Sequence, residues 1–194
     1  MIAEMARAGY LTCALPFNHM MSLYMACGEL ERVPEMIKDL RRYTLPDLVT
    51  YNIWLTYCSK KDSVKNAEKV FDLMRGDKVV PDWMTFSLMA SIYINAGLHV
   101  KGRDALVEME KRASRNERAA YSSLLTLYAS LQDRGHVTTE MYNSVLRTYA
   151  QAELMPLIID ERMDQDKVAM DEETRRLLRL TSKYPIGEAS TLMS

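Results

Sequence analysis

Apolar residues recur along the chain at the spacing of one helix face, in pairs of segments separated by short polar breaks. The spacing i, i+3, i+4, i+7 occurs twice between residues 51 and 74, first at Tyr51, Trp54, Leu55 and Cys58 and then at Ala67, Val70, Phe71 and Met74. This spacing is typical of amphipathic α-helices. The pattern therefore predicts pairs of helices joined by short turns.

The helix pair is repeated. The segment Pro46–Asn52 (PDLVTYN) returns as Pro81–Ser87 (PDWMTFS), 35 residues later. A fixed period of this length indicates an array of small units, each of which buries its apolar face against its neighbours. Proline followed by aspartate marks the boundary between units, because proline cannot continue a helix. The sequence thus predicts an all-α solenoid of stacked antiparallel helix pairs.

The register of this repeat divides the chain into successive units. The expected boundaries are a remnant of a preceding second helix at 1–13, repeats at 14–47, 48–82 and 83–117, a shortened repeat at 118–138, a repeat at 139–171, a terminal capping helix at 172–184 and a flexible tail at 185–194. The fourth copy is short, because Tyr142 opens a new first helix only 21 residues after Tyr121. The polar segment 132–137 is interpreted either as a loop or as an internal deletion, and the chain either as a processed form or as a fragment.

Composition narrows the function classes. The 194 residues are 48% hydrophobic, enough for a continuous stacked core, but without the run of about 18 apolar residues that a membrane span needs. The 25 basic and 26 acidic residues give a net charge of −1, so no strong overall attraction to polyanions is expected. The 15 methionines are interpreted as irregular core filling.

Candidate chemistry is sparse. The three cysteines, Cys13, Cys27 and Cys58, are odd in number and indicate packed, reduced thiols rather than a disulfide framework. The three histidines lack the spacing of metal ligands, and we expect neither a metal nor another cofactor. No glycine-rich phosphate loop, nucleophile elbow or His-Glu-x-x-His motif is present, so we expect neither an enzyme nor a small-molecule substrate.

Two segments carry a family resemblance. The phrase Pro46–Asn52, followed by AEKVFDLM at Ala67–Met74, resembles the repeat signature of P-type pentatricopeptide repeat proteins of plant organelles. The W-x₂-L-G-x₂-Y signature of the related tetratricopeptide repeat is absent. The resemblance implies a right-handed solenoid in which each helix pair reads one RNA base with two or three side chains.

The resemblance also assigns roles to residues. Base reading falls to the fifth residue of each first helix and the last residue of the unit, namely Asn18 with Asp47, Asn52 with Asp82, Ser87 with Glu117 and Asn143 with Asp171. It implies a uracil preference for each Asn–Asp pair. Base wedging falls to the second residue of each first helix, Leu15, Val49, Met84 and Ala119, and contact with the RNA backbone to Lys60.

Elementary chemistry allows a second interpretation of the same residues. An asparagine amide offers both a donor and an acceptor to a base edge, and a nearby carboxylate can fix which way it points. Asparagine and aspartate near helix starts are, however, most often caps or turn residues. The recurrence of Asn18 and Asn52 in register, each with its aspartate, favours the reading role.

Function is therefore expected to be single-stranded RNA binding, with U-containing targets, in organellar RNA processing, splicing, stability or translation. The alternatives are a structural or assembly subunit of an organellar ribonucleoprotein such as a mitoribosome, and a protein–protein adaptor. A homodimer or ribonucleoprotein partners would complement so short an array. The resemblance places the protein in a mitochondrion or chloroplast, although no transit peptide is visible at Met1.

Overall fold

The computed structural model describes residue 7 and residues 12–113, 118–132, 138–151, 163 and 167–181. Within these residues all regular structure is helical, which confirms the predicted all-α class. The chain divides into two compact units, 1–98 and 99–194. The expected remnant helix at 1–13 lies largely outside the described residues, and the tail at 185–194 lies wholly outside them.

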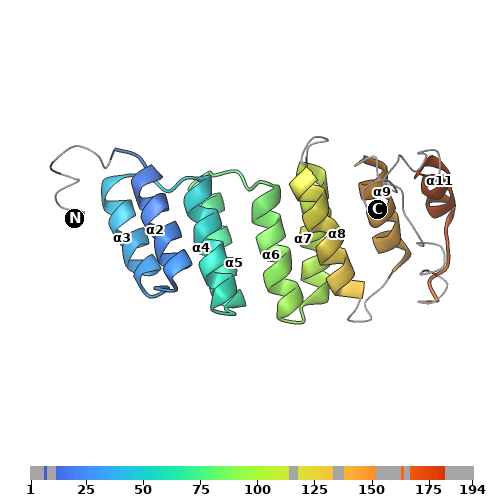
Figure 1. The fold of residues 1–194 in the computed structure, drawn as a ribbon, viewed down its shortest axis with the longest axis horizontal. Helices are drawn as coiled ribbons and strands as arrows, with labels where there is room; N and C mark the ends of the chain where they lie inside the picture. Colours follow the sequence, from blue (N-terminus) through green and yellow to red (C-terminus); the bar gives the residue numbers. More distant parts are fainter. Residues whose placement is uncertain are drawn as a thin grey trace, which may run out of the picture. The chain divides into compact units, whose positions relative to one another are not determined.

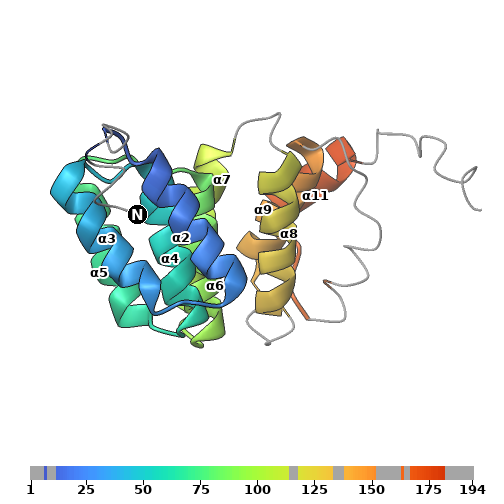
Figure 2. The same ribbon diagram turned by 60° about the vertical axis from the view of Figure 1, so that its left-hand side comes forward.

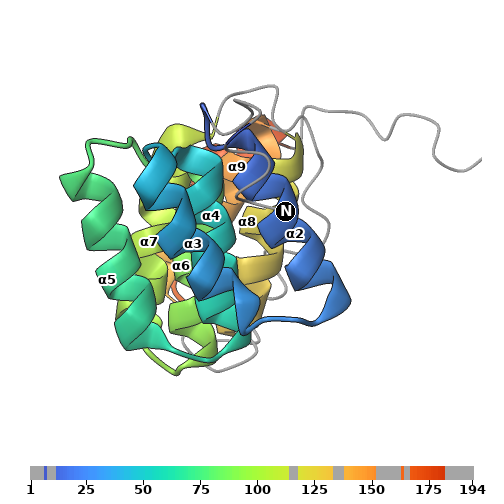
Figure 3. The same cartoon turned by 90° about the vertical axis from the view of Figure 1, so that its left-hand side faces the viewer.

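The first unit is built from helix pairs. Its helices are α2 (Leu15–Cys27), α3 (Arg32–Tyr43), α4 (Leu48–Lys60), α5 (Val64–Gly76) and α6 (Trp83–Asn95) (Figure 1). Helix α2 packs on α3 and α4 packs on α5, while α4 also lies between α2 and α6. The first helices of successive pairs thus form one layer and α3 and α5 the other (Figure 2). In Figure 3, α5 and α2 lie at opposite edges of this unit.

Local sequence explains where these helices begin and end. Asp47 and Asp82 are the N-caps of α4 and α6, each accepting a hydrogen bond from the backbone N–H three residues later. Helix α2 ends at Gly28, whose φ of 78° is the left-handed conformation that glycine adopts without strain. A turn at residues 61–63 follows α4, and Asp62 there has a φ of 49°.

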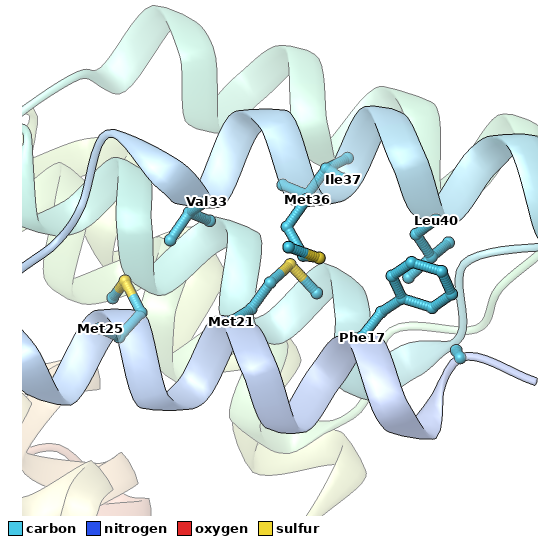
Figure 4. Packing of buried hydrophobic residues seen from close by; sticks show 8 residues of the cluster. Phe17, Met21, Met25, Val33, Met36, Ile37 and Leu40 are labelled. Atoms are coloured by element: carbon cyan, nitrogen blue, oxygen red, sulfur yellow. The ribbon is translucent and has the colours of Figure 1, made fainter. Parts of the chain in front are cut away.

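The core of the first pair lies between α2 and α3. Figure 4 shows Phe17, Met21 and Met25 on one helix facing the other, where the side chains of Val33, Met36, Ile37 and Leu40 meet them. All seven are buried, at the i, i+3 and i+4 spacings expected for one helix face. Met21 and Met36 lie at the centre of this cluster, in agreement with the interpretation of methionine as core filling.

A polar contact joins successive second helices of the first unit. Arg41 of α3 donates hydrogen bonds to the hydroxyl of Tyr51 at 2.9 Å and to the carboxylate of Asp77 at 3.0 Å. Burial, together with the hydrogen bond to Asp77, raises the pKa of Tyr51 to about 12, so its hydroxyl stays protonated and donates to Asp77. This contact links α3, α4 and the end of α5.

The second unit contains α7 (His99–Arg112), α8 (Arg118–Gln132), α9 (Thr139–Gln151) and α11 (Glu172–Thr181). Helix α9 packs against α8 and α11. Its Arg147 side chain makes ion pairs with Glu110 of α7 at 3.1 Å and with Glu173 of α11 at 2.7 Å. Tyr142, Leu146, Met163 and Leu177 form a buried apolar cluster beside it. None of the helices described is long and apolar enough to cross a membrane.

Candidate nucleic-acid interface

The first predicted pair, Asn18 with Asp47, is joined in the structure together with a third residue. Asn18 of α2 is buried, with 4% of its surface exposed, and its Nδ2 donates to Asp47 Oδ1 at 3.0 Å. The hydroxyl of Thr50 lies 2.8 Å from Asn18 Oδ1. We call this arrangement of asparagine, aspartate and threonine an Asn–Asp–Thr cluster.

The same cluster occurs twice more. Asn52, 8% exposed, donates to Asp82 Oδ1 at 3.3 Å, and the Thr85 hydroxyl lies 2.7 Å from Asn52 Oδ1. In the second unit Asn143, 3% exposed, donates to both Asp171 oxygens, at 3.1 and 3.0 Å. Thr174 lies 2.7 Å from Asn143 Oδ1. Three of the four predicted reading pairs are therefore brought together by hydrogen bonds.

The fourth predicted pair is not tested by these contacts. Ser87 lies on α6 at the place that Asn52 occupies on α4, but Glu117 lies outside the described residues. Of the residues predicted to wedge between bases, Leu15, Val49 and Met84 are exposed apolar side chains in the first turns of their helices, and Ala119 is exposed near the start of α8. Lys60, predicted to contact the RNA backbone, is exposed at the end of α4.

Helix capping explains how each cluster forms. Asp47 Oδ1 accepts from the Thr50 backbone N–H at 2.8 Å, while the Thr50 hydroxyl lies 3.3 Å from the Asp47 N–H, which completes a capping box. Asp82 and Thr85 repeat both contacts. The capping interpretation is thus right for the aspartates. Asn18 and Asn52 instead lie inside their helices and bind the N-cap of the first helix in the following repeat.

The threonines were missed as site residues by reasoning from the sequence. Their signal was the third residue after each aspartate, in the phrase Pro-Asp-x-x-Thr shared by the two best copies. Asp171 and Thr174 place the carboxylate-to-backbone contact of these caps at the start of α11, where the Asp171 carboxylate accepts from the Thr174 N–H at 2.7 Å. Helix α11, expected to be a terminal capping helix, thus begins with an aspartate that accepts from the backbone N–H three residues later, as α4 and α6 do.

Hydrogen bonding favours the ionised form of the clustered aspartates. Partial burial by itself raises the pKa of Asp47, but hydrogen bonds from the Thr50 backbone, the Asn18 amide and the Thr50 hydroxyl outweigh it and hold that pKa below its ordinary value. The pKa of Asp171 is lowered by the backbone N–H and then the hydroxyl of Thr174, followed by the Asn143 amide. Both carboxylates are thus acceptors near neutral pH.

These lowered pKa values predict acid sensitivity. The folded chain binds protons at Asp47 and Asp171 less readily than the unfolded chain, so their stabilisation is complete above the ordinary carboxyl pKa of about 4 and is lost as the pH falls through the lowered values. We expect the free energy of unfolding, measured with urea at a series of pH values, to decrease below about pH 4. In Asp47→Asn, which keeps an acceptor oxygen but does not titrate, part of this decrease should disappear. An unchanged pH profile in that variant would contradict the assignment.

Comparisons with known proteins agree with this architecture. A model described as a PPR repeat family matches residues 46–95, and a model of the PPR repeat matches residues 16–44. A pentatricopeptide repeat-containing protein of Arabidopsis thaliana is 36% identical over 128 residues, which are 65% of this chain and 26% of that protein. A second Arabidopsis pentatricopeptide repeat-containing protein, named as mitochondrial, is 39% identical, with 98% of this chain and 65% of that protein covered. The chain belongs to the pentatricopeptide repeat proteins.

The relatives are longer than this chain. It spans about a quarter of the length of the first relative and less than two thirds of the second. The match to the second extends over 346 residues, more than the 194 of the chain, so that relative contains residues within the matched stretch that have no counterpart here. The large ribosomal subunit protein mL101 (rPPR4) of Arabidopsis is 47% identical over 57 residues, 29% of this chain and 12% of that protein.

Among solved structures, the crystal structure of the maize pentatricopeptide repeat protein PPR10 resembles this one. It has a TM-score of 0.50 at 18% sequence identity, with 91% of this chain and 28% of PPR10 covered. At this identity the likeness concerns the fold, which is the α-solenoid implied by the 35-residue period.

Proposed function

We propose that the chain binds single-stranded RNA along its first helices and reads individual bases at the three Asn–Asp–Thr clusters. The observation that carries the proposal is the repetition of one buried amide arrangement at Asn18, Asn52 and Asn143. Helix capping requires only the aspartate and the threonine. It does not explain why an asparagine of the preceding repeat contacts them in each case. Repeats of this family provide one base contact per helix pair.

The amides retain hydrogen-bonding capacity for a base. An asparagine side chain has two N–H donors and two acceptor lone pairs on its oxygen. In each cluster one donor is engaged by aspartate and one lone pair by threonine, which leaves a second N–H and a second lone pair. A uracil edge offers one acceptor and one donor in matching positions, which is why we propose U-containing targets.

Affinity is proposed to come from base faces more than from charge. Exposed Leu15, Val49 and Met84 offer apolar contacts to bases of any sequence. With a net charge of −1, the chain neutralises few phosphates, so we expect a shallow dependence of RNA affinity on salt. Lys60 is proposed as one backbone contact.

A second candidate function is that of a subunit of an organellar ribonucleoprotein, in which RNA is held with little base discrimination. It is favoured by the similarity to a protein named as part of a large ribosomal subunit. We also propose a mitochondrial location, because several of the similar Arabidopsis proteins are named as mitochondrial.

Binding to oligouridine and oligoadenosine strands of equal length, at one stated salt concentration, tests the proposal. We expect tighter binding to oligouridine, and a loss of roughly tenfold in that preference when Asn18→Ala and Asn52→Ala are combined. Asn66→Ala, on the exposed surface of α5, is the matched control and should bind as the unaltered chain does. Circular dichroism verifies that each variant is folded.

Two results would contradict base reading. Equal affinity for both strands, unchanged by the asparagine substitutions, would support the ribonucleoprotein subunit instead. Failure to bind either strand at moderate salt would leave the protein–protein adaptor.

A further inference from the structure

Each reading asparagine has a second fixed partner besides aspartate, the hydroxyl of a threonine in the next first helix. The Oγ1···Oδ1 distances are 2.8 Å for Thr50 and Asn18, 2.7 Å for Thr85 and Asn52, and 2.7 Å for Thr174 and Asn143. An amide oxygen carries no proton, so the hydroxyl must supply the one between them, and it shares this proton with the aspartate Oδ1 that lies 2.8 Å away in each cluster. All three threonines are fully buried.

The aspartate and threonine contacts together fix the orientation of the asparagine amide, which one contact alone would not do. With aspartate alone, the amide could pivot about its Nδ2···Oδ1 hydrogen bond and change the plane that it presents. The threonine hydroxyl holds the other end of the amide, so the plane is fixed. A fixed amide presents its remaining N–H and lone pair in one order, and such preorganisation is the basis of discrimination between ligands of the same shape.

Reading positions with asparagine and reading positions with serine can be compared within this chain. Five residues lie at the reading position of a first helix and are followed by another first helix, namely Asn18, Asn52, Ser87, Ser122 and Asn143. The three asparagines are followed, at the third position of the next helix, by Thr50, Thr85 and Thr174. The two serines are followed there by Ala120 and Met141. Threonine and the N-cap aspartate thus accompany the amide together, since the residues before the helices of Ala120 and Met141 are Glu117 and Thr138.

We propose that Thr50, Thr85 and Thr174 are positioning residues for base recognition, which hold each asparagine amide in one orientation and thereby favour uracil over cytosine. The inference rests on the proposed function. Uracil and cytosine have the same ring shape, but a carbonyl oxygen at position 4 of uracil is an amino group in cytosine, and a ring N–H donor becomes an acceptor. An amide held in one orientation fits one of them, whereas a rotating amide can satisfy both.

The origin of each threonine gives α11 a part in the site. In each cluster the asparagine belongs to the first helix of one repeat. The aspartate and the threonine belong to the start of the next first helix. Asn143 on α9 therefore depends on Asp171 and Thr174 at the start of α11. Helix α11 therefore completes the reading position of Asn143.

The test compares oligouridine and oligocytidine strands of equal length with the full chain. Thr→Val at residues 50, 85 and 174 removes the hydroxyl at nearly constant volume, and we expect the uridine-over-cytidine affinity ratio to fall by about fivefold. Thr→Ser at the same positions keeps the hydroxyl and should keep the ratio. Thr148→Val is a matched control, because this buried hydroxyl donates to the Ser144 carbonyl within α9.

The single variant Thr174→Val serves if the triple variant does not fold, since it changes only the last reading position; its effect is read on a strand with one uridine-to-cytidine change opposite that position. A ratio unchanged by Thr→Val, in a folded chain that itself prefers uridine, would overturn the inference and leave the proposed function intact. An unaltered chain that binds both strands equally would overturn base reading, and with it this inference.

Discussion

Asp47→Ala is expected to lower the free energy of unfolding of the unit 1–98 by about 3 kcal/mol. Asp47 Oδ1 accepts from the Thr50 N–H, from the Asn18 amide and from the Thr50 hydroxyl, at 2.8 to 3.0 Å. Loss of an N-cap costs about 1 kcal/mol, and a buried amide left without its acceptor costs about 1–3 kcal/mol more. The effect is large because a single oxygen serves all three donors.

Tryptophan fluorescence during urea unfolding of the full chain measures this effect. The two tryptophans, Trp54 and Trp83, both lie in the unit 1–98, so the signal reports that unit. Asp72→Ala, at an exposed position of α5, should change stability by less than about 0.5 kcal/mol. If Asp47→Ala were no more destabilising than Asp72→Ala, the Asn–Asp–Thr clusters would have no role in holding successive repeats together.

Leu55→Ala is expected to be as damaging, through the core. Leu55 has no exposed surface and lies on the buried face of α4 with Tyr51 and Cys58. Truncation of a fully buried leucine removes its transfer free energy and leaves a cavity, at a cost of about 3 kcal/mol. Because a stacked array is held by contacts between neighbouring elements, the loss in α4 also weakens its packing on α5 and α6.

The comparison for Leu55→Ala is Val49→Ala on the same helix. Val49 is 53% exposed, so its truncation should change the free energy of unfolding by less than about 0.5 kcal/mol. Its proposed role as a base wedge predicts weaker RNA binding at unchanged stability. Similar destabilisation by both variants in the same urea experiment would mean that the two faces of α4 are not distinguished by burial.

Much of the fold could be predicted from the sequence because its signals are local. Helical spacing at Tyr51, Leu55 and Cys58 and the Pro-Asp boundaries are properties of a few consecutive residues, and repetition made them readable. Glycine at position 28 and the polar residues 61–63 are turn signals of the same local kind. The polar segment 132–137 interrupts the period, and there the sequence allowed two interpretations, a loop or an internal deletion.

The site was predicted only in part. Family resemblance paired Asn18 with Asp47 and Asn52 with Asp82, and the structure joins both pairs. Neither the resemblance nor residue chemistry indicated the threonines, because a threonine three residues after a helix cap has a sufficient explanation in the cap itself. Its second contact, with an amide from the preceding unit, depends on how neighbouring helices pack.

The sequence by itself determined the helix pairs, their period and the units they form, since these follow from spacing and from proline and glycine at turns. Tertiary structure alone decided that Asn18, 29 residues before Asp47, is buried against the N-cap of the next first helix and accepts a hydrogen bond from the Thr50 hydroxyl. The physical reason is that hydrogen bonds between neighbouring repeats depend on how their helices pack side by side. Sequence separation does not specify that packing.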